Sequence, residues 1–153
     1  MFERMRAEKN MEKNIPGPFG GTHVKLLMRE ANQESMRSVA HMAQFLAGLV
    51  RSVDMRMLGL SIYDVPVELA KLEIQPFEDE GGITGVGVLS TSHAACHTWP
   101  ERRSGVIDVY SCREFNIDKV VEFVSEFWEV DMKNIQVTDL SRSLAWQDFS
   151  HRV

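Results

Sequence analysis

Three short β-type runs follow one another between residues 83 and 112, and they constrain the fold more than any other feature of the sequence. The runs are GVGVLS, HAACHTW and GVIDVYSC, and only brief breaks separate them. Strands that lie this close in sequence usually pair with their neighbours through tight turns. We therefore expect a three-stranded antiparallel meander in this part of the chain.

The rest of the chain interleaves further strands with two amphipathic helices. Thr22–Met28 alternates apolar and polar residues as a half-buried strand does. Apolar residues recur at spacings of three and four after Asn32 and again after Asn116, and each asparagine can cap a helix. One apolar stripe per helix indicates an α+β two-layer sandwich, with a mainly antiparallel sheet and two helices packed on one face. The other expected strands are 55–63, 71–77 and 135–137.

Composition favours a single domain without nucleic-acid, membrane or metal partners. A chain of 153 residues with 44% hydrophobic residues can bury one core. We expect a flexible tail over 1–20, the domain over 21–140 and a C-terminal extension over 141–153. The net charge of −5 offers no basic patch, the two cysteines form no CxxC zinc motif, and no apolar run approaches the roughly 20 residues that span a bilayer. The charged N-terminal stretch points to the cytoplasm.

Reactive side chains gather in the meander. If the strands on either side of residues 100–104 pair symmetrically about Arg102, Ser92 lies level with Cys112. A tight reversal at residues 90 and 91 places Thr84 level with His97, about 5 Å apart across the ladder. Taken singly, each of these residues is more often structural than catalytic. Spacing alone therefore indicates an α+β domain with only a weak sign of a site.

Together, however, these residues resemble the bacterial and archaeal S-adenosylmethionine decarboxylases. The family pattern is a Ser-His pair, three variable residues, His-Thr-aromatic-Pro-Glu, and later a strand that ends in an aromatic residue, a small residue and Cys. The resemblance covers roughly residues 21 to 140. The matching positions are Ser92, His93, His97, Thr98, Trp99, Pro100, Glu101, Tyr110, Ser111 and Cys112.

The resemblance implies that the chain cuts itself between Thr91 and Ser92 into fragments 1–91 and 92–153. Ser92 would become a covalent pyruvoyl group, so no external cofactor is needed. This group forms a Schiff base with the substrate amine and accepts the electrons released with CO₂. The implied reaction converts S-adenosylmethionine to its decarboxylated form, the aminopropyl donor for spermidine synthesis.

The resemblance also implies roles for the residues around Ser92. Thr84 matches the processing hydroxyl, and His97 matches the base that removes the α-proton. Cys112 matches the acid that returns a proton to the substrate. Glu101 would bind the ribose hydroxyls, and Phe77 would lie against the adenine. Family members of this short form are homodimers or larger, in which one subunit contributes the pyruvoyl group and cysteine and the other the hydroxyl, histidine and carboxylate.

Three departures from the family pattern leave alternatives open. Many relatives have an acidic residue where this chain has Thr91, and serine is more usual than threonine at position 84. The acidic turn 78–80 could attract a sulfonium, a guanidinium or an ammonium group. A pyruvoyl-dependent arginine or ornithine decarboxylase of the same fold is therefore the first alternative. An unprocessed, non-catalytic dimeric binding protein is the second, although the joint presence of Ser92, His97 and Cys112 argues against it.

Overall fold

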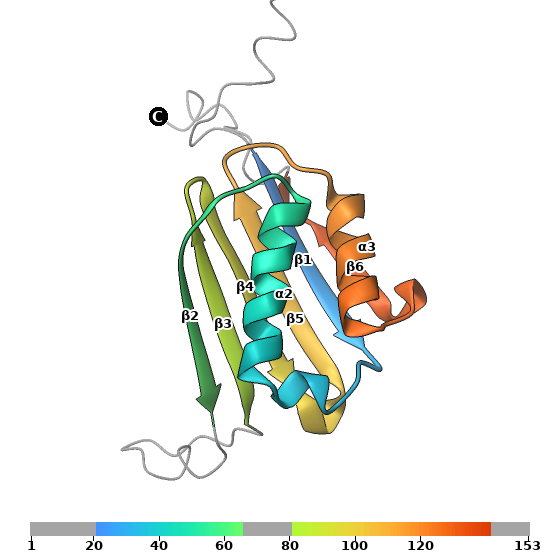
Figure 1. Cartoon of the computed structure of the whole chain (residues 1–153). Coiled ribbons are helices and arrows are strands. Elements are labelled where there is room, and N and C mark those ends of the chain that lie inside the picture. The colour runs from blue at the N-terminus through green and yellow to red at the C-terminus, as the bar shows by residue number, and fades with distance from the viewer. Residues whose placement is uncertain (1–20, 66–80, 142–153) are drawn as a thin grey trace, which may run out of the picture.

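The computed structural model describes residues 21–65 and 81–141, with only the backbone of Val65 included. These residues form one antiparallel sheet with two helices on one of its faces (Figure 1). The strand order is β2-β3-β4-β5-β1-β6. This architecture confirms the expected two-layer α+β fold. The elements are β1 Thr22–Arg29, α2 Val39–Ser52, β2 Met57–Val65, β3 Gly82–Leu89, β4 Ser92–Trp99, β5 Ser104–Ser111, α3 Ile117–Trp128 and β6 Ile135–Asp139, with short 3-10 turns η2 Ser35–Arg37, η4 Pro100–Arg102 and η5 Met132–Asn134.

The expected meander is formed by β3, β4 and β5, and one of its two predicted registers is correct. Thr84 lies opposite His97, as the tight reversal between β3 and β4 requires. Ser92, however, lies opposite Ser111 and not opposite Cys112. The prediction was wrong by one residue because the β4–β5 connection spans only residues 100–103. It consists of η4 and a left-handed Arg103 with φ +49°.

The two helices start at different distances from their predicted caps. Asn116 caps α3, and its side chain accepts two backbone N–H groups of the first turn. The first helix was expected after Asn32, but α2 begins only at Val39, because Ser38 has an extended backbone and serves as the cap. Asn32 instead accepts two N–H groups in the turn before η2. As a consequence Val39 is the first residue of α2, and it is 43% exposed.

The hydrophobic core lies between the sheet and the two helices. In β1 the expected alternation holds, since Val24, Leu26 and Met28 are fully buried. Gly85 lets α2 lie close on β3, because a Cβ there would come within 2.7 Å of the Leu46 side chain. The opposite face of the sheet, which we call the open face, carries no helix from the part of the chain that the structure describes (Figure 1).

Several predicted segments fall outside the described residues. They are the tail 1–20, the strand 71–77 with Phe77, the acidic turn 78–80 and the C-terminal extension beyond Ser141. Within the residues that are described, no helix is long and apolar enough to cross a membrane.

Candidate active site

The predicted site residues form two groups at opposite ends of β4. Ser92 begins the strand, with Thr91 and Cys112 beside it, whereas His97 lies five residues further along with Thr84. At the usual rise of a β-strand the two groups are about 16 Å apart. One chain alone therefore does not bring the serine and the histidine into contact.

The peptide between Thr91 and Ser92 is held in an unusual conformation. The backbone N–H of Cys112 donates a hydrogen bond of 3.0 Å to the carbonyl oxygen of Thr91. Ser92 has a φ of +147°, in a region that residues with a side chain rarely adopt. Such a conformation costs on the order of 1–3 kcal/mol and persists only where the surroundings enforce it. The bond thus combines a polarised carbonyl with a strained serine.

Ser111 fixes the side chain of Thr91. Its buried hydroxyl donates to Thr91 Oγ1 at 3.1 Å and accepts the N–H of Arg113 at 3.0 Å. On its other side, Thr91 Oγ1 contacts the sulfur of Met55 at 3.8 Å. Ser111 was not among the predicted site residues, because the predicted register placed Cys112 opposite Ser92. The family pattern, which has a small residue directly before the cysteine, was the one sign of Ser111 in the sequence.

Thr84 and His97 are joined by a hydrogen bond on the open face. Thr84 Oγ1 lies 3.0 Å from His97 Nδ1, and both side chains are half-buried. The His97 ring also stacks on Trp99, with ring centroids 6.3 Å apart. The contact uses Nδ1 and leaves Nε2 for a second partner. This geometry suits a base whose ring orientation is fixed by a neighbouring hydroxyl.

Glu101 lies in η4, and two donors from the segment that contains η2 bind its carboxylate. Arg37 donates to Oε1, and Gln33 donates to Oε2 at 3.1 Å. The Glu101 side chain is 59% exposed. The carboxylate therefore faces solvent in a fixed orientation and keeps further lone pairs for a ligand.

A second polar cluster, which was not predicted from the sequence, lies on the open face near the start of β4. Asp108 accepts hydrogen bonds from Nε2 of His23 at 3.0 Å and from Nε2 of His93 at 3.1 Å. The Tyr110 ring contacts both histidine rings. His93 directly follows Ser92, so this cluster holds the side chain of the residue next to the serine. The only sign of this cluster in the sequence is the alternation of polar and apolar residues along three strands.

The two cysteines lie in contrasting environments. Cys96 is completely buried, and burial raises the pKa of its thiol far above the usual range. Cys112 is partly exposed and follows the last residue of β5. Only Cys112 is therefore suited to proton exchange with a substrate.

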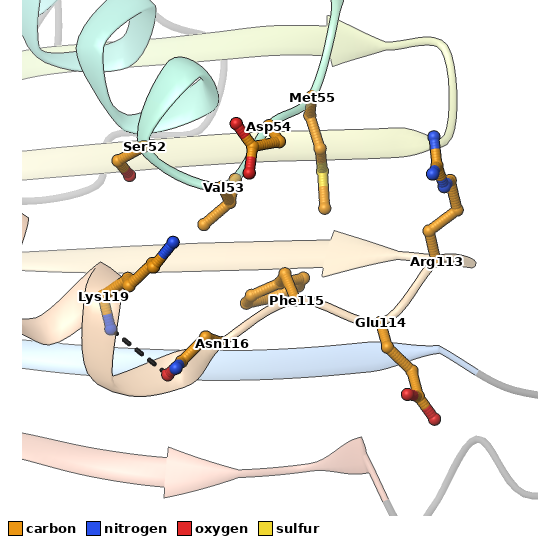
Figure 2. A pocket seen from close by; sticks show the side chains of 9 residues that line it. All are labelled: Ser52, Val53, Asp54, Met55, Arg113, Glu114, Phe115, Asn116 and Lys119. Carbon is orange, nitrogen blue, oxygen red and sulfur yellow. Dashed lines mark hydrogen bonds between the residues drawn. The ribbon is translucent and has the colours of Figure 1, made fainter. Parts of the chain in front are cut away.

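A cavity of about 290 Å³ opens between the end of α2 and the start of α3 (Figure 2). Met55, which contacts Thr91, forms part of its wall. No group of three or more metal-binding side chains occurs in the part of the chain that the structure describes. The cavity is lined by Ser52, Val53, Asp54, Met55, Arg113, Glu114, Phe115, Asn116 and Lys119.

Comparison with known proteins gives one consistent family. The family model described as S-adenosylmethionine decarboxylase matches residues 22–143. An S-adenosylmethionine decarboxylase proenzyme from Thermodesulfovibrio yellowstonii is 24% identical over 116 residues, 75% of this chain and 76% of that protein. One from Pyrococcus furiosus is 33% identical over 75 residues, 47% of this chain and 52% of that protein, so the aligned part spans about half of the archaeal relative.

The fold also has a counterpart among solved structures. The crystal structure of the adenosylmethionine decarboxylase from Aquifex aeolicus superimposes with a TM-score of 0.61 and 21% sequence identity. The match covers 80% of this chain and 90% of that one. At this identity the likeness establishes the shared fold.

Proposed function

The chain belongs to the S-adenosylmethionine decarboxylase family, and from this premise we propose that it is a self-processing, pyruvoyl-dependent enzyme of the cytoplasm. It converts S-adenosylmethionine to decarboxylated S-adenosylmethionine, the aminopropyl donor for spermidine synthesis. The observation that supports this function most directly is the Thr91–Ser92 peptide. Its carbonyl oxygen accepts the Cys112 N–H, and its serine has a φ of +147°.

Self-cleavage begins when the Ser92 hydroxyl attacks the carbonyl carbon of Thr91. The C–N bond then breaks, which leaves an ester on Ser92 Oγ and a free amine on residue 92. Loss of the Ser92 α-proton expels Thr91 as a carboxylate and leaves dehydroalanine, whose imine form reacts with water to give the pyruvoyl group and ammonia. The Cys112 N–H is positioned to stabilise the oxyanion of the first step.

A base for the α-proton comes from a second subunit in this proposal. Within one chain His97 and Thr84 are about 16 Å from Ser92. A two-fold axis through the open face would place the Ser92 end of one sheet over the His97 end of the other. Apolar side chains on the open face support such packing, since Val88 is 53% and Tyr63 65% exposed.

In the decarboxylation, the pyruvoyl group derived from Ser92 would supply an electrophile for the substrate amine and an electron sink for the bond to the departing CO₂. Cys112 holds a proton beside residue 92 and returns it to the substrate α-carbon. Glu101, oriented by Arg37 and Gln33, accepts hydrogen bonds from the ribose hydroxyls. Phe77 is proposed to lie against the adenine.

Intact-mass analysis of the purified protein tests this function. We expect fragments 1–91 and 92–153, the second of them blocked to Edman degradation, and a single chain for Ser92→Ala. The release of CO₂ from S-adenosylmethionine, arginine and ornithine is then measured side by side. A preference for arginine or ornithine would contradict the proposed substrate. An intact chain that releases no CO₂ would instead favour the non-catalytic binding protein.

A further inference from the structure

We propose that Arg113 binds the carboxylate that self-cleavage leaves on Thr91, and that this ion pair holds the end of fragment 1–91 on the cavity side of the cut. This inference rests on the proposed function, because the carboxylate exists only in the cleaved protein. It assigns a role to a residue that follows Cys112 and that neither cleavage nor decarboxylation uses.

The backbone around Arg113 already encloses Thr91 before cleavage. The neighbouring N–H of Cys112 binds the Thr91 carbonyl oxygen at 3.0 Å. The N–H of Arg113 donates to the Ser111 hydroxyl at 3.0 Å, and that hydroxyl donates to Thr91 Oγ1 at 3.1 Å. In Figure 2 the Arg113 side chain extends from the end of β5 toward the turn between β3 and β4. Residues 90 and 91 form this turn.

Cleavage would create a carboxylate on Thr91 that needs a further hydrogen-bond donor, and Arg113 can provide one. The new carboxylate has two oxygens, and the Cys112 N–H serves only one of them. A guanidinium offers several N–H donors in a geometry that matches a carboxylate. The Arg113 side chain is exposed, and it makes no ion pair with any of the described residues.

The other charged side chains that line the cavity are less well placed to interact with the Thr91 carboxylate. Lys119 is the second cation of the lining, but it lies in the first turn of α3, away from the contacts that join residues 111–113 to Thr91. The carboxylate of Glu114 points away from Met55 and Arg113 (Figure 2). Asp54 lies across the cavity, after the end of α2. Arg113 is therefore the cation best placed for the new chain end.

The ion pair has two consequences for the processed enzyme. It draws the Thr91 carboxylate toward the cavity, so that the negative charge does not oppose the carboxylate of an incoming amino-acid substrate. It also adds an attachment between fragments 1–91 and 92–153, which are separate chains after the cut.

A double-mutant cycle isolates the interaction, because Ser92→Ala prevents the carboxylate from forming. Urea unfolding is measured at one protein concentration for the wild type, Arg113→Gln, Ser92→Ala and the double variant. We expect Arg113→Gln to lower the urea midpoint of the processed protein by roughly 0.3–0.5 M and to leave the Ser92→Ala protein unchanged. Arg113→Lys should recover part of the loss. Lys119→Gln, with the same change of charge in the same cavity, should lower neither midpoint.

Equal losses in the processed and Ser92→Ala backgrounds would overturn the inference, as would a larger effect of Lys119→Gln than of Arg113→Gln. Intact-mass analysis separates this failure from a failure of the proposed function. If the wild-type chain is never cut, both proposals fall, because no Thr91 carboxylate is ever made. If it is cut and the cycle shows no coupling, only the role of Arg113 falls.

Discussion

The backbone N–H of Cys112 donates to the carbonyl oxygen of Thr91 at 3.0 Å, which ties the residue after β5 to the residue before β4. In the proposed function, one residue thereby serves two successive reactions. Its main-chain N–H acts on the peptide that is to be cut, and its thiol donates the proton in the decarboxylation. The first role does not depend on the side chain, whereas the second does.

Cys112→Ala should therefore separate processing from catalysis. We expect self-cleavage close to the wild-type extent, because the backbone N–H is retained. Decarboxylation should fall by about 10²-fold or more, because a positioned proton donor is lost. Mass analysis measures the first effect and CO₂ release the second. Cys96→Ala is the matched control, since this buried thiol faces the core and should leave both reactions intact. A Cys112→Ala chain that fails to cut itself would contradict the division of roles.

The 16 Å between Ser92 and His97 predicts complementation between subunits. His97→Ala alone should fail to cleave, and Ser92→Ala alone cannot. When the two variants are co-expressed, mixed dimers place an intact Ser92 opposite an intact His97 of the other subunit. Fragments of the His97→Ala chain should then appear, and mass analysis identifies which chain was cut.

A mixture that forms heterodimers and produces no fragments would contradict the two-subunit site. Thr84→Ala should behave like His97→Ala in the same assay, although less severely, because it removes the hydroxyl that contacts the histidine and leaves the ring in place.

Arg37 should affect substrate binding through Glu101, whose carboxylate it orients. For Arg37→Ala we expect KM for S-adenosylmethionine to rise about two- to five-fold, the size of an exposed ion pair. Self-cleavage and kcat should change little. The increase should vanish with a substrate analogue that lacks the ribose hydroxyls. Arg51→Ala, an exposed arginine at the end of α2, serves as control. An increase that persists with the analogue would show that Arg37 acts elsewhere.

His41 should make the stability of the fold sensitive to acid. Its ring packs against Phe127 and Trp128, and its buried Nε2 has no hydrogen-bond partner among the described residues. Burial lowers the pKa of His41 from its ordinary value of 6.5, and the charge of Glu129 offsets this only in part. The unfolded chain thus binds more protons than the folded one as the pH drops below 6.5, so stability should fall in that range.

The measurement for His41 is urea unfolding in the uncleaved Ser92→Ala background at pH 7 and pH 5.5. The midpoint should fall on acidification, and by less when His41→Phe is added. Equal pH dependence with and without the histidine would refute this origin of the acid sensitivity.

The fold and half of the site could be predicted from local patterns. The pairing of Thr84 with His97 followed from a two-residue turn, which fixes the register of a hairpin directly. The predicted partner of Ser92 was wrong by one residue, because the connection between β4 and β5 consists of the 3-10 turn η4 and a left-handed Arg103. No propensity rule fixes the length of such a connection.

The Asp108 cluster could not be predicted for a different reason. It joins His23 of β1 to two residues of the meander that lie 70 and 85 positions later in the sequence. The contact exists only once β1 inserts between β5 and β6. Which distant strand pairs with an edge of the meander depends on the packing of the whole sheet, and local alternation carries no information about it.

The φ of +147° at Ser92 has a consequence for the direction of processing. This torsion is defined by the bond to Thr91, so it ceases to exist when that bond is broken. The unfavourable free energy of about 1–3 kcal/mol is then released and cannot be regained by the separated ends. In the proposed processing, each molecule would thus fold into a high-energy precursor that is consumed once. Folding would then supply part of the driving force for maturation, and loss of ammonia would make the step irreversible.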